Sequence, residues 1–121
     1  TTAEPYDWLA TQADPDRWAT ASQGPCPVNY HVPTAAEWIT ADTYSTGWAN
    51  LIEAYNSVLK LPSSSIRSEY SGLLSNPGFF AYYWSSTVSG TEASNFILFS
   101  INAGATERYR SLGCTVRCLK D

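Results

Sequence analysis

The order of apolar and polar residues divides the chain into a helical part and a strand-forming part. Between residues 45 and 59, apolar side chains recur at helical spacing, at Trp48, Leu51, Ile52, Tyr55 and Leu59. This spacing places them on one face of a helix. We therefore expect a helix that begins near Ser45 or Thr46 and packs this face on the core. Pro62 cannot continue it.

A shorter helix is expected immediately before this one. Thr34 and Glu37 stand three residues apart ahead of an apolar position, which is the pattern of a capping box. It predicts a helix over residues 35–41. The region 1–33 carries five prolines and should be mostly irregular, with one helical turn over residues 14–19 and a short strand over residues 28–32.

After Pro62, short apolar runs alternate with Gly, Ser, Asn and Pro. We expect strands over residues 64–68, 81–86, 93–101 and 114–119. The turn signals lie at residues 76–78, 89–90 and 102–104, and residues 102–112 read as a loop. Two helices followed by antiparallel strands form an α+β pattern, and 121 residues suffice for a single domain over residues 1–121.

Composition narrows the classes of partner. Aromatic residues make up 14% of the chain and charged residues 15%, which is typical of a packed core and not of disorder. The net charge of -4 leaves no basic face for nucleic acid or an anionic membrane. No apolar run approaches the roughly 20 residues of a membrane span, and residues 1–5 lead us to expect no signal peptide.

The chain holds three cysteines, so at least one thiol has no partner within it. In a strand, Cys114 and Cys118 would lie roughly 13 Å apart, which is beyond disulfide reach. A bond between Cys26 and Cys118 is the pairing to test first. Three reduced thiols are the other arrangement.

Two separated motifs carry a resemblance to a known family. The first is Gly24-Pro-Cys26-Pro-Val-Asn-Tyr30-His31-Val-Pro33-Thr34-Ala-Ala-Glu37-Trp38, in which Asn29 stands where the family usually has Gly. The second is Tyr83-Trp84-Ser85-Ser86-Thr87, with Gly113-Cys-Thr-Val116-Arg117-Cys118-Leu-Lys120-Asp121 closing the chain. Over residues 7–121 the sequence resembles the Fibrobacter succinogenes major paralogous domain and the variable proteins of diversity-generating retroelements of phages, bacteria and archaeal viruses.

The resemblance implies a C-type lectin-like fold, with two helices packed on a small twisted antiparallel sheet and long loops. In such variable proteins, adenine-directed mutagenesis rewrites the C-terminal region, which forms the binding face. It therefore implies a receptor-binding or display protein on a virion or cell surface. Its partner would be a protein or other macromolecule, and the binding face would lie mainly within residues 79–112.

Strand alternation separates two faces in residues 93–101. Phe96 and Leu98 point one way, while Ile97, Phe99 and Ile101 point the other. Either the strand is buried on both sides, or the second set forms an exposed binding face, which is what the resemblance implies. The complete set of expected ligand contacts is Phe79, Phe80, Tyr82, Ile97, Phe99, Ile101, Asn102, Glu107, Tyr109 and Leu112.

Several residues favour structural roles over chemistry. His31 is the only histidine and should serve packing and hydrogen bonding, because no catalytic triad can be built around it. Arg117 is expected to pair with a carboxylate or carbonyl, while Arg108 and Arg110 would flank Tyr109 in a contact rim. The calcium-binding signatures of lectins are absent, so we expect no metal and no cofactor.

Two other functions compete with a diversified binding module. Formylglycine-generating oxidases share the broad fold and use two C-terminal cysteines, but the residues around Cys114 and Cys118 do not match theirs. We therefore expect no enzyme. A non-diversified structural domain of the cell surface is the other alternative. It predicts that Ile97, Phe99 and Tyr109 are buried or scattered.

Overall fold

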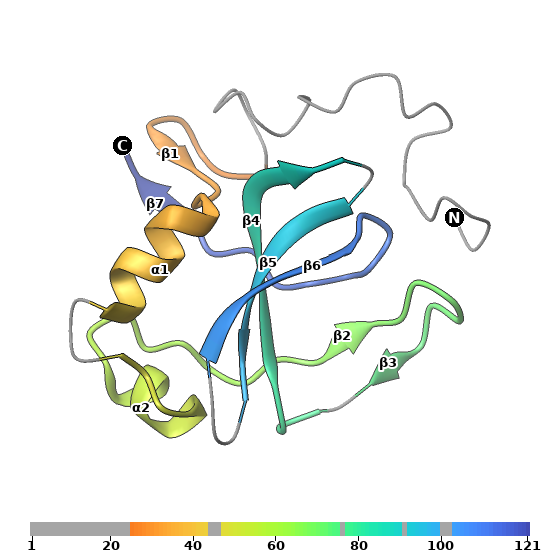
Figure 1. Ribbon diagram of the computed structural model, residues 1–121, viewed down its shortest axis with the longest axis horizontal. Helices are drawn as coiled ribbons and strands as arrows, with labels where there is room; N and C mark the ends of the chain where they lie inside the picture. Colours follow the sequence, from red (N-terminus) through yellow and green to blue (C-terminus); the bar gives the residue numbers. More distant parts are fainter. Residues whose placement is uncertain (1–24, 44–46, 76, 91, 100–102) are drawn as a thin grey trace.

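A computed structural model describes residues 25–43, 47–75, 77–90, 92–99 and 103–121 (Figure 1). The helical turn expected over residues 14–19 lies outside them. The described helices are α1 (Ala35–Thr43) and α2 (Leu51–Asn56). The strands are β1 (Tyr30–His31), β2 (Ile66–Arg67), β3 (Leu74–Ser75), β4 (Ala81–Ser89), β5 (Glu92–Leu98), β6 (Ala103–Tyr109) and β7 (Leu119–Lys120).

The described strands form three small antiparallel sheets. The largest has the order β4-β5-β6, and β2 pairs with β3. The third joins β1 to β7, which brings residues from the two ends of the described chain side by side (Figure 1). The expected combination of two helices with antiparallel strands is therefore confirmed.

The core forms where α1 crosses the three-stranded sheet. The indole of Trp38 stacks on Phe96 of β5, with ring centroids 5.5 Å apart, and lies against Tyr83 of β4 at 5.4 Å. Its N–H donates to the Trp84 carbonyl at 3.3 Å. Trp48 meets the same Phe96 ring edge-on at 6.0 Å. These buried aromatic contacts attach α1 and the loop before α2 to the sheet.

Strand β5 is buried on both faces, so the exposed second face is wrong for Ile97, whereas Phe99 is half-buried beyond the end of the strand and Ile101 lies outside the described residues. Every residue from Ala93 to Leu98 is buried, and β4 and β6 pair with the two edges of the strand. The segment after β6 contacts both β4 and β5. Thr115 exchanges hydrogen bonds with β4 at 2.9 Å, and the Asn95 amide contacts the Cys114 sulfur at 3.9 Å.

The start of α1 confirms the capping box. The Glu37 N–H donates to the Thr34 hydroxyl at 3.2 Å, and the Thr34 N–H donates to the Glu37 carboxylate at 2.8 Å. A third bond runs from the Ala35 N–H to the Thr87 hydroxyl at 3.0 Å. The helix start is therefore determined locally and attached to β4.

The face predicted for the second helix is wrong. Helix α2 begins only at Leu51, because the Asn50 side chain accepts from the N–H groups of Ile52 and Glu53. Ile52 is 71% exposed and Tyr55 56% exposed, whereas Ala54 is buried. Trp48 reaches the core from the preceding loop, so it and Ile52 do not share a helical face.

Strand β6 was expected to be a loop. It is poor in β-branched residues, yet its backbone pairs with β5 from Leu98↔Ala103 to Glu92↔Tyr109. The short strand β3 was also missed. Conversely, one expected strand is shorter than predicted: residues 114–119 contain only the start of β7 and an isolated bridge between Thr115 and Tyr83.

The covalent link between the two ends of the described chain agrees with one of the two expected arrangements. Cys26 and Cys118 form a disulfide with Cα atoms 5.7 Å apart, and Cys114 is free. Asn29, between Cys26 and β1, has a φ of 65°, the conformation that its replacement of Gly suggests. The Arg117 guanidinium donates to the Leu59 carbonyl at 3.1 Å, which confirms its structural role.

Gly113, in the segment after β6, lies in close backbone contact with Arg67 of β2. A Cβ at Gly113 would lie 2.6 Å from the Cβ of Arg67, with which Gly113 exchanges two backbone hydrogen bonds of 2.9 Å. We expect Gly113→Ala to lower the free energy of unfolding by about 1–3 kcal/mol in urea denaturation. Gly104→Ala is the control, because no atom lies within 4 Å of its added Cβ. Equal effects of the two changes would contradict the close contact.

Candidate ligand-binding face

Three of the expected ligand contacts are buried, and for them the expectation is wrong. Tyr82 is 7% exposed, Ile97 3% and Leu112 2%. Tyr82 and Ile97 are directly opposed in the β4–β5 pair. Leu112 follows β6 in a turn closed by its N–H donating to the Tyr109 carbonyl at 3.0 Å. These side chains contribute to folding and do not face a ligand.

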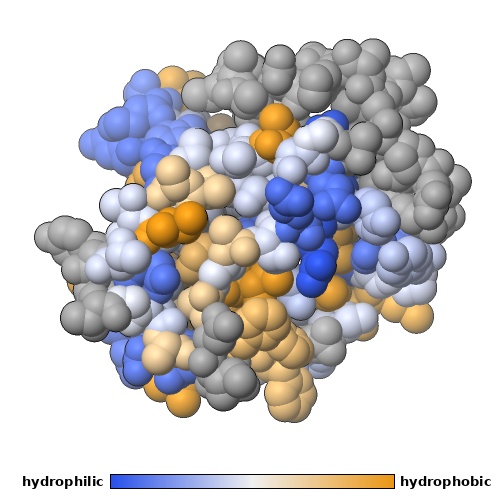
Figure 2. Space-filling model, in the orientation of Figure 1, coloured by the Kyte–Doolittle hydropathy of each residue, from blue (hydrophilic) through white to orange (hydrophobic). Residues whose placement is uncertain are grey.

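Three other expected contacts gather at one end of the sheet. Phe79 is 69% exposed in the turn before β4. Phe80 and Phe99 are half-buried and meet edge to face, with ring centroids 5.2 Å apart. We call Phe79, Phe80 and Phe99 the aromatic end. It lies where β4 begins and β5 ends, at the bottom of Figure 1, and apolar atoms gather in the same area of Figure 2.

A groove of about 440 Å³ lies beside the aromatic end. This volume falls within the range of small-ligand pockets. The groove contains no Lys, Arg, Asp or Glu among its lining residues. They are Asn50, Leu51, Ile52, Tyr55, Pro62, Ser63, Gly78 and Phe79. Ile52 and Tyr55 were missed as site residues because their helical spacing assigned them to the core.

Backbone hydrogen bonds hold the walls of the groove to the sheet. The Leu51 N–H donates to the Phe99 carbonyl at 3.0 Å, which joins α2 to the end of β5. On the other wall, the Ser64 N–H donates to the Phe80 carbonyl at 2.9 Å. The exposed side chains of this region therefore stand on a backbone that is held at several points.

A buried tyrosine adds a further attachment below the groove. The Tyr83 hydroxyl donates to the Pro62 carbonyl at 2.7 Å. Burial raises the pKa of Tyr83 to about 12, against a smaller opposing effect of Arg117, so the hydroxyl keeps its proton at neutral pH. The turn on the opposite wall depends on Gly78, whose φ of 81° suits glycine and positions Phe79 outward.

The remaining expected contacts do not join the aromatic end. Glu107 is exposed and accepts from the Ser89 hydroxyl at 2.6 Å. Tyr109 is half-buried and pairs with Glu92, whereas Phe99 follows the other end of β5. Seven residues of strand separate these ends by roughly 20 Å. Ile101 and Asn102 lie outside the described residues.

The expected contact rim around Tyr109 is also incomplete. Arg110 is only 5% exposed and donates to the Gly90 carbonyl at 2.8 Å, so its charge serves the β4–β5 turn. Arg108 alone of the two arginines is exposed. The single continuous face expected over residues 79–112 is therefore not present among the described residues.

The two C-terminal cysteines do not form a pair of free thiols. Cys118 belongs to the disulfide. Burial raises the pKa of the Cys114 thiol to about 12, with the Asn95 hydrogen bond acting in the opposite direction. A thiol in that environment is a poor nucleophile at neutral pH. Among the described residues, no three His, Cys, Asp or Glu side chains are grouped to hold a metal ion.

Comparison with known proteins gives no relative. No protein-family model, curated protein or solved structure matches the chain. Within the part of the chain that the structure describes, no helix is long and apolar enough to cross a membrane.

Because Ile97 is buried and Phe79 is exposed, we expect their replacement by Ala to change the free energy of unfolding by very different amounts. Ile97→Ala removes a buried side chain from the centre of the sheet and should lower the free energy of unfolding by about 2–5 kcal/mol. Phe79→Ala removes an exposed ring and should change it by no more than about 0.5 kcal/mol. Urea denaturation measures both. A large loss in Phe79→Ala would instead make the aromatic end part of the core.

The environment of Cys114 predicts slow alkylation in the folded protein. At about pH 7.5, iodoacetamide should modify the folded thiol at least about tenfold more slowly than the same thiol in urea, because the folded thiol stays protonated. Mass spectrometry of timed samples measures the rate. Equal rates in the two states would show that the thiol is ionised and accessible in the folded protein.

Proposed function

We propose that this chain is a C-type lectin-like variable protein of the diversity-generating retroelement kind, which binds a protein or other macromolecule through the aromatic end and its groove. The observation that carries the proposal is the outward Phe79 beside Phe80 and Phe99, on a backbone held to the sheet. The surface of a virion or cell is where such a domain would act. The Cys26–Cys118 disulfide fits an oxidising surrounding.

Separate residues serve folding and contact, which is what a variable binding domain requires. Trp38, Tyr83 and Phe96 are each no more than 2% exposed and hold the helix on the sheet. Phe79 and Ile52, in contrast, leave most of their surface in water. Changing an exposed side chain alters the free energy of unfolding little, so such positions tolerate variation.

The chemistry of this area suits macromolecular recognition. Large aromatic rings supply contact area with few rotatable bonds, so little side-chain entropy is lost when a partner binds. Hydrogen bonds of the Leu51 and Ser64 amides hold the surrounding backbone in advance of binding. A preformed face of this kind avoids much of the cost of ordering loops. The uncharged groove lining favours an apolar group of the partner.

The residue types of the aromatic end are compatible with diversification. Phenylalanine arises from an asparagine codon when its adenines are changed, and so do Tyr, Ile, Leu and Ser. All three members of the aromatic end therefore belong to the accessible set. A nearby reverse transcriptase and a template repeat that differs from the coding region only at adenines would support the retroelement assignment.

A non-diversified structural domain of the cell surface is the second candidate. The burial of Ile97 favours it, as does the separation of Phe99 from Tyr109 along β5 and β6. This candidate predicts that the aromatic end has no special capacity for binding and that no template repeat exists. Experiment therefore separates the two candidates directly.

A display library provides the binding test. Phe79, Phe80 and Phe99 are randomised together, and the library is selected against lysozyme as an arbitrary folded protein. We expect folded binders with Kd values in the micromolar range or better, because varied side chains would act on a fixed backbone. Binding is measured on purified clones by calorimetry, and folding by thermal denaturation.

A matched library controls for exposure alone. It randomises Val28, Val58 and Leu73, which are 81%, 96% and 68% exposed and do not line the groove. We expect far fewer binders from it. Equal yields from both libraries, or a general loss of folding when the aromatic end is randomised, would reject the aromatic end as a variable binding face.

A further inference from the structure

His31 lies between two carboxylates that come from different parts of the chain. Its Nδ1 atom is 2.7 Å from Oδ1 of Asp121, and its Nε2 atom is 3.2 Å from Oε1 of Glu37. The imidazole side chain is 18% exposed. Because the sequence contains no other histidine, any titration of an imidazole in this protein reports on this one cluster.

The geometry of the cluster requires a particular protonation state. Ionised carboxylates only accept hydrogen bonds, and a neutral imidazole carries a single N–H. Only the imidazolium, with two N–H donors, can serve Asp121 and Glu37 together. The Glu37 carboxylate is also an acceptor elsewhere, because the N–H and hydroxyl of Thr34 donate to its Oε2 at 2.8 and 3.0 Å.

The cluster closes the small β1–β7 ribbon on the start of α1. His31 belongs to β1, Asp121 follows β7, and Glu37 lies in the first turn of α1. The ribbon has only two residue pairs, supplemented by the Asp121 N–H donating to the Asn29 carbonyl at 3.0 Å. So short a ribbon depends on contacts from outside its own ladder.

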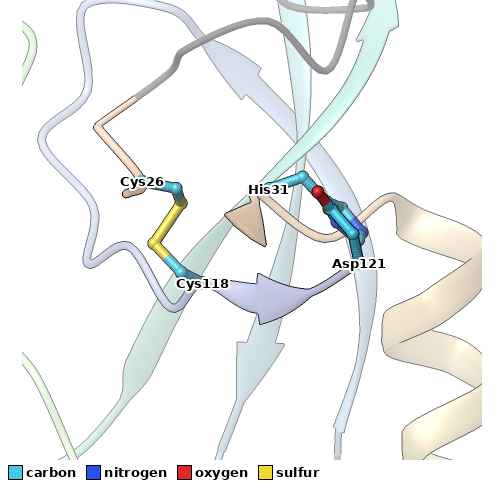
Figure 3. The surroundings of a disulfide bond; sticks show 4 residues. All are labelled: Cys26, His31, Cys118 and Asp121. Atoms are coloured by element: carbon cyan, nitrogen blue, oxygen red, sulfur yellow. A yellow bond between two sulfur atoms is a disulfide. The ribbon is translucent and has the colours of Figure 1, made fainter. Parts of the chain in front are cut away.

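Two attachments flank β7, one covalent and one ionic. Cys118 precedes the strand and is bonded to Cys26, while Asp121 follows it and contacts His31 (Figure 3). Opening of the ribbon on the ionic side therefore leaves it attached through the disulfide. The β1–β7 ribbon can therefore open and close while the Cys26–Cys118 bond keeps its two strands connected.

We propose that His31, Glu37 and Asp121 form an acid-closed latch, in which the imidazolium holds the β1–β7 ribbon against α1 and loss of its proton loosens the ribbon. The two carboxylates are the only charged groups that contribute to the electrostatics of His31 among the described residues. The contact with β4 is uncharged, because the Ser86 N–H donates to the Pro33 carbonyl at 2.8 Å. The latch is independent of the proposed binding function, because the aromatic end lies at the other end of β4.

The pKa of His31 sets how the stability contributed by the latch changes at its upper pH limit. The hydrogen bond to Asp121 raises the pKa of His31 above its usual 6.5, burial opposes this, and Glu37 adds to it. Because the folded pKa lies above the unfolded one, the stabilisation is complete below pH 6.5 and is lost as the pH rises through the folded value.

The acidic limit comes from Glu37. Burial would raise the pKa of this carboxyl, but the hydrogen bonds from Thr34 and His31 outweigh it and hold the pKa below the usual 4.5. Its stabilisation is present above pH 4.5 and is lost as the pH falls through the lowered folded value. The latch is therefore tightest between about pH 4.5 and pH 6.5.

An NMR titration of the single imidazole tests the ionic contacts. From about pH 5 to about pH 9, the pKa of His31 should lie above 6.5 in the native protein and fall in both Asp121→Asn and Glu37→Gln. A native pKa at or below 6.5, or a value that neither substitution moves, would overturn the proposal.

Hydrogen exchange tests whether the proton controls the ribbon. After correction for the intrinsic effect of pH, the Asp121 amide should lose about two- to fivefold protection between about pH 6 and about pH 9. The amides of β5 should not change. In His31→Gln the ribbon should be equally protected at both pH values. A pH-independent ribbon in the native protein, or parallel loss of protection in β5, would refute an acid-closed latch.

Discussion

The packing of one indole between a helix and a sheet is the contact on which this domain depends. Trp38 stacks on Phe96, lies against Tyr83 and donates its N–H to the backbone of β4. These contacts place α1 across β4 and β5, while the segment after β6 contacts Asn95 of β5 and the backbone of β4. Apolar burial and the satisfied indole N–H act together here, because an unpaired buried donor would offset part of the gain.

Polar contacts determine how the remaining segments attach to this centre. The capping box sets the start of α1, and Asn50 sets the start of α2. The Tyr83 hydroxyl and the Leu51 amide then join the surroundings of α2 to the sheet. A groove results beside the aromatic end, with an uncharged lining on a backbone held by hydrogen bonds. Recognition is thus proposed at the end of the sheet opposite the β1–β7 ribbon, which the disulfide and His31 close.

The sequence predicted features that depend on residues close together in the chain, and it failed where contacts between distant segments decide the structure. The capping box was predictable because Thr34 and Glu37 are three residues apart and interact within one helical turn. Asn29 was suited to positive φ by its own side chain. Helical spacing failed for Ile52 and Tyr55, because Trp48 enters the core from the loop before α2 and the helix buries Ala54 against the core instead. Strand β6 was missed since its pairing with β5 compensates for weak local preference.

By itself, the sequence determined the two helices, the antiparallel character of the strands and the residues suited to an aromatic core. It also narrowed the disulfide to one pairing for testing, which the structure confirms as Cys26 with Cys118. Only the tertiary structure decided that Tyr82, Ile97 and Leu112 are buried while Phe79 faces solvent. The physical reason is that alternation along a strand separates two faces, but each face is covered or exposed by segments distant in sequence.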